Sequence, residues 1–357
     1  MRWVIGLLAV VLLAPGAGAA GPCASTGPEC IEWIAAGSAA VQTAVYRTYP
    51  LGARADGITS ALILVHGASR DGHNYFRHAL AAAFLAGALE RTVVIAPRFA
   101  SSDGACRDAM GAAEAHWACA AGADSWRTGG TALNDATLTS FDVADEVLRR
   151  LARKDAFPGL RRIVVAGHSA GGQFVSRYAL ANRVHEALGV PITYVVANPS
   201  SYAYLDPSRP SPSALPPGIA AGAPGYTAPV PANAPPPFGP FADARNCTTY
   251  DTWPYGLQAR AGYSARVADA DLKAALVGRP VTYLLGGLDI LPLFGFDTSC
   301  AAMAQGPTRL ARGLAYARYA SERHGAAHKT VLVPSCGHNA RCMFTADDAL
   351  ALVFPRD

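Results

Sequence analysis

The stretch that most constrains this chain is Arg161–Gln173, which reads RRIVVAGHSAGGQ. A short apolar run rich in β-branched residues, Ile163–Ala166, stops at Gly167, and a segment suited to a helix follows the turn. The pattern Gly167-x-Ser169-x-Gly171 between a strand and a helix is typical of a nucleophile elbow, a turn so sharp that side chains at the glycine positions would collide with their surroundings. The sequence therefore predicts a serine hydroxyl presented at the end of a buried strand.

Apolar strands and helices alternate along most of the chain, which predicts an α/β fold with a mostly parallel sheet covered on both faces. Near the start of the chain, apolar and polar residues alternate over Ala40–Tyr49, which predicts an edge strand or one arm of a hairpin. The other expected strands are 61–65, 92–96, 163–166, 192–196, 281–285 and 330–333. The expected helices are 75–89, 140–153, 263–276, 308–324 and 345–352, and an irregular loop is expected over 98–137. With 357 residues, 51% of them hydrophobic, one large domain spanning 20–357 is expected.

One segment departs from this alternation. Pro207–Pro240 holds 12 of the 26 prolines and almost no charge, so it is suited to neither helix nor sheet. Two interpretations stay open for the wider segment 205–255, a lid or cleft wall near the active-site edge and an ordinary surface linker.

The first residues are typical of an export signal. Arg2 precedes an apolar run, Trp3–Leu13, which is too short to span a bilayer, and Ala17–Ala19 offers small residues for cleavage. Residues 1–19 are therefore predicted to be a removed signal peptide, and the protein to be secreted or periplasmic. A membrane anchor and a lipid on Cys23 are the alternatives.

All eight cysteines follow that segment, and an even number in an exported chain indicates disulfides. Eight cysteines allow 105 pairings. The simplest choice is local pairing, which gives Cys23–Cys30, Cys106–Cys119, Cys247–Cys300 and Cys336–Cys342. Zinc binding around His338, which Cys336 and Cys342 flank, is the alternative, but no second ligand pair completes a site.

A serine hydroxyl needs a base to remove its proton and a carboxylate to orient that base. In parallel sheets such groups gather beyond the carboxyl ends of the strands. Asp289 follows strand 281–285 at that edge and is the predicted acid, with Asp297 and Asp206 as lesser candidates. His338 follows the last strand and is the predicted base. Its nearest rivals, His324 and His328, precede that strand and should lie at the opposite edge.

Two backbone N–H groups are needed to stabilise an oxyanion. The Ala170 N–H, directly after the serine at the start of a helix, is the first predicted donor. The second is expected from the loop that follows strand 61–65, with Ala68 as the donor and Ser69 as the alternative. His66 is expected to fix that loop.

Taken together, the chain from about Ala40 onward resembles the α/β-hydrolase-fold serine hydrolases of the secreted esterase, lipase and polyester-depolymerase type. The resemblance rests on HG at 66–67, GHSAG at 167–171, Asp289 and GH at 337–338. It implies an acyl-enzyme on Ser169, with His338 as general base and then acid, Asp289 orienting it, and no cofactor. The chain departs from the pattern by lacking a run of glycines after His66 and the usual Asp-x-x-Val around Asp289.

An exported carboxylic-ester hydrolase acting on a small or polymeric ester is therefore expected, with a peptidase or amidase of the same fold and a non-catalytic binding protein as alternatives. The net charge of +4 without a basic block gives no indication of nucleic-acid binding. No metal and no stable membrane insertion are expected, and the sequence specifies no oligomeric state. An apolar, aromatic cleft is predicted, lined by Tyr202, Tyr204, Trp253, Tyr255, Leu291, Leu293, Phe294 and Phe296.

Overall fold

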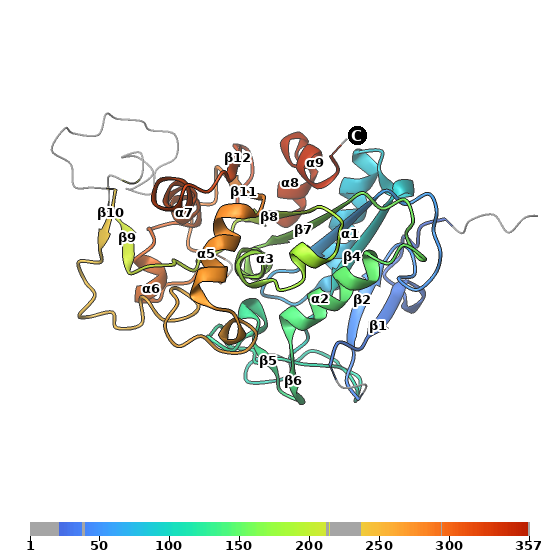
Figure 1. Cartoon of the computed structure of the whole chain (residues 1–357), viewed down its shortest axis with the longest axis horizontal. Coiled ribbons are helices and arrows are strands. Elements are labelled where there is room, and N and C mark those ends of the chain that lie inside the picture. The colour runs from blue at the N-terminus through green and yellow to red at the C-terminus, as the bar shows by residue number, and fades with distance from the viewer. Residues whose placement is uncertain (1–20, 38–39, 212–213, 215–236, 294, 356–357) are drawn as a thin grey trace, which may run out of the picture.

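A computed structural model describes residues 21–37, 40–211, 214, 237–293 and 295–355 (Figure 1). Its centre is an eight-stranded sheet with the order β1-β2-β4-β3-β7-β8-β11-β12. The strands are β1 (Ile31–Ile34), β2 (Thr43–Arg47), β3 (Ser60–Val65), β4 (Thr92–Pro97), β7 (Arg162–His168), β8 (Ile192–Ala197), β11 (Val281–Gly286) and β12 (Lys329–Val333).

The six strands from β4 to β12 in this order are parallel to one another, as predicted. β2 runs antiparallel to both β1 and β4. The segment Ala40–Tyr49 therefore forms a hairpin arm, and its interpretation as an edge strand is wrong because β1 covers its outer side. β1 escaped prediction because its four residues are too few to show a clear alternation.

Helices cover both faces of the sheet (Figure 1). Successive residues of a strand point to opposite faces, so Ile63 and Val65 of β3 belong to one apolar core, whereas Leu62 and Leu64 belong to the other. α2, α3, α5 and α7 pack on the first core, and α1, α8 and α9 on the second. The helices are α1 (Gly72–Leu85), α2 (Ser140–Leu151), α3 (Ala170–Ala181), α5 (Asp269–Gly278), α6 (Cys300–Met303), α7 (Arg309–His324), α8 (Ala340–Thr345) and α9 (Asp347–Val353).

Three predicted segments differ in detail from the structure. The irregular loop 98–137 contains a short ribbon, β5 (Thr131–Ala132) with β6 (Asp135–Thr139). The helix expected over 263–276 starts only at Asp269, and the last expected helix, 345–352, corresponds to α9 and is preceded by a further short helix, α8. These differences lie at element boundaries, where tertiary contacts compete with local preference.

The segment 205–255 is described in part. β9 (Ser208–Pro210) pairs with β10 (Phe238–Pro240), and residues 215–236, most of the proline-rich stretch, lie outside the described residues. The predicted signal peptide, 1–19, lies outside them as well. None of the helices in the described ranges has the length and hydropathy that crossing a membrane requires.

The four predicted disulfides are all present. Cys23–Cys30, Cys106–Cys119 and Cys336–Cys342 close short loops of 7, 13 and 6 residues, and Cys247–Cys300 closes one of 53. The zinc alternative is wrong, because Cys336 and Cys342 are bonded to each other.

Candidate active site

The elbow around Ser169 has the tight geometry that its glycines predict. Ser169 adopts a φ of 59°, in a region that non-glycine residues rarely occupy, and its N–H donates to the Ala197 carbonyl at 2.9 Å. A Cβ at Gly167 would lie 2.2 Å from the Gly171 carbonyl oxygen, and one at Gly171 would lie 2.2 Å from that of Val65. Only glycine fits at both positions, so α3 can start directly beneath the serine.

The structure brings the three predicted polar side chains into one hydrogen-bonded chain. Ser169 Oγ lies 2.9 Å from His338 Nε2, and His338 Nδ1 lies 2.7 Å from Asp289 Oδ2. Ser169 and Asp289 are 8% and 2% exposed. The serine thus borders solvent, whereas the carboxylate is enclosed, as an orienting group in a Ser-His-Asp arrangement would be.

The lesser candidates have other partners. Asp297 accepts a hydrogen bond from the Tyr255 hydroxyl at 2.8 Å, and Asp206 lies 3.7 Å from His324. His328 Nδ1 lies 2.9 Å from the Tyr283 hydroxyl. Each of these residues therefore has a polar contact that does not involve Ser169.

His66 fixes the loop that carries the predicted second oxyanion donor. Its Nε2 accepts a hydrogen bond from the Phe99 N–H at 2.9 Å, so the proton is on Nδ1, which donates to the Gly67 carbonyl at 2.9 Å. Burial lowers the pKa of His66 to about 4, which keeps the ring neutral. Since a trans peptide holds its C=O and N–H on opposite sides, the Ala68 N–H points away from the anchored Gly67 carbonyl.

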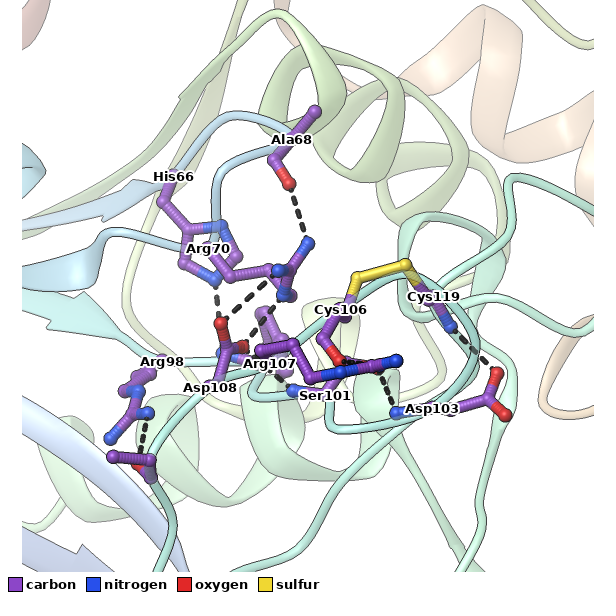
Figure 2. A network of polar contacts seen from close by, with 12 residues as sticks. His66, Ala68, Arg70, Arg98, Ser101, Asp103, Cys106, Arg107, Asp108 and Cys119 are labelled. Carbon is purple, nitrogen blue, oxygen red and sulfur yellow. Dashed lines mark hydrogen bonds and ion pairs between the residues drawn. A yellow bond between two sulfur atoms is a disulfide. The ribbon is translucent and has the colours of Figure 1, made fainter.

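A second set of contacts reaches the same loop from the Arg70 side chain (Figure 2). Arg70 donates to the Ala68 carbonyl at 2.8 Å and pairs with Asp108, 38 residues away in the chain. Neither residue was singled out in the sequence, because a distant Arg–Asp pair leaves no local pattern.

Two more polar residues that the sequence did not single out hold the acid and the base. The buried guanidinium of Arg309 lies 3.4 Å from Asp289 and donates to the Leu293 carbonyl at 2.7 Å. Asn198, at the end of β8, accepts from the Gly286 N–H at 2.8 Å and donates to the Gly337 carbonyl at 3.3 Å. Asn198 was detectable as a polar residue at the correct strand end, whereas Arg309 starts a helix and gave no such signal.

A cavity of about 610 Å³ opens beside the serine. Its wall combines polar side chains with apolar surface and comes from the loop after β3, the start of α1 and the segment around His338. The lining residues are Gly67, Ala68, Ser69, Asp71, Tyr75, His78, His168, Ser169, Gly295, His338, Asn339, Ala340 and Arg341.

The prediction of an aromatic cleft is largely wrong. Tyr202, Tyr204 and Trp253 are at most 2% exposed and pack in the core, where a sequence cannot distinguish them from cleft aromatics. Leu291 and Leu293 are exposed, Tyr255 and Phe296 contact Asp297 and Arg312, and Phe294 lies outside the described residues. None of the described residues of 205–255 lines the cavity.

One cluster in the described part of the chain combines metal-ligating residue types, namely Cys23, Glu29 and Cys30. Its two cysteines form a disulfide, so they have no thiolate to offer a metal. This cluster lies outside the group formed by Ser169, His338 and Asp289.

The chain was compared with family models, with curated sequences and with solved structures. The model of the alpha/beta hydrolase family matches residues 62–353. Two similar solved structures are the poly(3-hydroxybutyrate) depolymerase LpqC of Bordetella parapertussis and poly(aspartic acid) hydrolase-1 of Sphingomonas sp. KT-1. The first has a TM-score of 0.55 at 20% identity and covers 89% of this chain and 85% of its own. The second has a TM-score of 0.57 at 21% identity and covers 91% and 97%. At these identities the likeness shows the fold. No curated protein sequence matches the chain.

Proposed function

The chain belongs to the alpha/beta hydrolase family, and we propose that it hydrolyses carboxylic esters with Ser169 as the nucleophile. The observation that carries the proposal is the continuous chain of hydrogen bonds from Ser169 Oγ through His338 to Asp289, with distances of 2.9 and 2.7 Å. A nucleophile within reach of a base, itself oriented by a carboxylate, is what acyl transfer requires.

In the proposed reaction, His338 Nε2 takes the Ser169 proton while Oγ attacks the ester carbonyl carbon. Asp289 stabilises the imidazolium that forms. The carbonyl oxygen becomes an oxyanion that accepts hydrogen bonds from the N–H groups of Ala68 and Ala170. The ester C–O bond then breaks, and the alcohol leaves with the proton from His338. Water, activated by the same histidine, attacks the acyl-enzyme and releases the carboxylic acid, so no cofactor takes part.

The substrate proposal follows from the cavity beside Ser169. Its wall places the polar side chains of Asp71, Asn339 and Arg341 beside apolar surface, which suits an ester that carries both polar and apolar groups. One of the similar structures is named for a polyester and the other for poly(aspartic acid), so an amidase of the same fold is the second candidate.

We also infer that the protein works outside the cytoplasm, in the periplasm or the medium. Four disulfides stabilise it, and disulfides persist in oxidising compartments. Cleavage after the predicted signal peptide is checked by mass spectrometry of the N-terminus of protein recovered from an exporting host.

The test of the nucleophile is labelling with a fluorophosphonate probe. Wild-type protein should be labelled and Ser169→Ala should not, whereas Ser69→Ala, which removes a second serine of the same cavity, should still be labelled. Labelling of Ser169→Ala at the wild-type level would contradict the assignment, and an unlabelled wild type would favour a non-catalytic binding protein.

The test of the reaction is a series of chromogenic esters of increasing acyl length beside the matching anilides, with Ser169→Ala as the blank. Faster turnover of the esters supports the proposal, and faster turnover of the anilides supports the amidase.

A further inference from the structure

Arg70 lies in the loop between β3 and α1, directly after the predicted oxyanion donor. Its φ of 56° is in the left-handed region, which is unfavourable for a residue with a side chain. Such a conformation persists only where several contacts impose it.

Those contacts come from both the backbone and the side chain of Arg70. The N–H donates to the Gly67 carbonyl at 3.1 Å, and Nη1 donates to the Ala68 carbonyl at 2.8 Å. Together with the His66 contact, they anchor the carbonyl groups of both peptides that flank the Ala68 α-carbon. With both peptide planes held, the Ala68 N–H keeps one direction.

Asp108 in turn holds the Arg70 guanidinium (Figure 2). Nε lies 2.7 Å from Oδ2 and Nη2 lies 3.1 Å from Oδ1, a two-point pairing in which the side chains are only 12% and 17% exposed. Paired, partly enclosed contacts of this kind fix both direction and distance. An arginine without this pairing would rotate freely and would donate to the Ala68 carbonyl only part of the time.

Asp108 is itself held by the loop after β4. Its Oδ2 accepts from the Ser101 N–H at 2.8 Å, and its own N–H donates to the Ser101 carbonyl at 3.1 Å. The Cys106–Cys119 disulfide closes the loop two residues before Asp108. The loop after β4 thus holds Asp108, Asp108 holds Arg70, and Arg70 holds the Ala68 carbonyl.

We propose that Arg70, held by Asp108, is a positioning residue that aims the Ala68 N–H at the oxyanion. This inference rests on the proposed ester hydrolysis at Ser169. The contact matters in the transition state more than in the bound substrate, because charge develops on the carbonyl oxygen only there. Loss of the contacts that Arg70 makes with Ala68 and Asp108 should therefore lower kcat and leave KM nearly unchanged.

The test measures kcat and KM of purified full-length variants on one chromogenic ester. Since removing a whole oxyanion donor costs about 100- to 1,000-fold in kcat, Arg70→Met should cost about 10- to 100-fold, because the donor stays but loses its support. Asp108→Asn should lower kcat in the same direction, and the double variant should be no worse than Arg70→Met alone, because the two residues act as one unit. Arg70→Lys, which keeps the charge but not the two-point pairing, should recover only part of the loss.

The matched control is Arg47→Met, which breaks a pair with Glu32 of similar exposure, 13% and 20%, at the β1–β2 end of the sheet. It should lower the melting temperature and keep kcat. A second readout is the affinity for a trifluoromethyl ketone, whose adduct with Ser169 carries an oxyanion. That affinity should fall with kcat in Arg70→Met.

An unchanged kcat in Arg70→Met, or a loss no greater than in Arg47→Met, would overturn the inference. If Arg70→Met does not fold, the same criterion applies to Asp108→Asn and Arg70→Lys. A wild type that neither hydrolyses esters nor binds the ketone would instead refute the proposed function.

Discussion

The buried imidazole of His66 should make the stability of this protein depend on pH well above the range in which carboxylates titrate. In the folded protein one ring nitrogen donates and the other accepts, and the pKa is lowered from 6.5 to about 4, chiefly by burial. In the unfolded chain the ring is solvated, with a pKa near 6.5. Between these two pKa values the unfolded state binds a proton at His66 and the folded state does not. The free energy of unfolding must therefore decrease as the pH falls from 6.5 towards 4.

The size of the effect follows from the two pKa values. At 1.36 kcal/mol for each pKa unit, the folded state loses on the order of 3 kcal/mol through His66 once the pH is below 4. Between about pH 6 and pH 5 the free energy of unfolding should fall by about 1 kcal/mol for each pH unit through this residue alone. His168, whose pKa burial also lowers, adds to the slope in the same direction.

The assay is urea unfolding followed by tryptophan fluorescence, at several pH values between about 7 and 5, above the range of carboxylates in unfolded chains. His66→Gln should be less stable at every pH and should show a flatter dependence, reduced by about 1 kcal/mol for each pH unit. His73→Gln makes the same change at an exposed position of α1 and should leave the slope unchanged. An equal slope in His66→Gln and wild type, or an NMR titration of His66 near 6.5, would refute the reasoning.

Two further predictions concern the elbow and the disulfides. Gly171→Ala should destabilise the fold by about 3 kcal/mol or more and abolish activity, because its Cβ would lie 2.2 Å from the Val65 carbonyl oxygen; Gly278→Ala, with open space around it, should unfold in urea like wild type. Replacing both cysteines of Cys247–Cys300 by alanine should cost about 4 kcal/mol, against about 2 for Cys336–Cys342, since the longer loop gains more entropy on release. The order in kcat should be the reverse, because His338 lies two residues from Cys336 in the shorter loop, whereas Asp289 lies 11 residues from Cys300 in the longer loop and is also held by Arg309. A larger loss of kcat in the Cys247–Cys300 variant would contradict this reasoning.

The prediction of a sharp turn at Ser169 and of a mostly parallel sheet is confirmed, because both features leave local patterns. Buried parallel strands are continuous apolar runs, and Gly167 and Gly171 flank the serine at fixed spacing. The choice of Asp289 over Asp297 and Asp206 used one rule, that parallel strands deliver their loops to the same edge. That rule is a property of topology, so it required no knowledge of side-chain contacts.

The prediction that aromatic side chains line the cleft is wrong for a physical reason. Tyr202 and Tyr204 follow a strand at the correct edge, yet they are buried in the core, because an aromatic ring serves a core and a binding wall equally well. The cavity beside Ser169 is lined by Tyr75, His168 and Asn339, which come from three separate parts of the chain, and no spacing in the sequence joins them.

By itself, the sequence indicated most of the sheet strands, the sharp turn at Ser169 and the acid and base candidates, because each depends on neighbours in the chain or on a rule of topology. The disulfide pairs were only the simplest choice among the possible pairings, and the folded chain decides between them. Only the tertiary structure decided which charged side chains support the site. Arg70 and Asp108 are 38 residues apart, and Arg309 and Asp289 are 20 apart. An ion pair has no sequence period, and its partners become recognisable only when the folded sheet brings their loops to one edge.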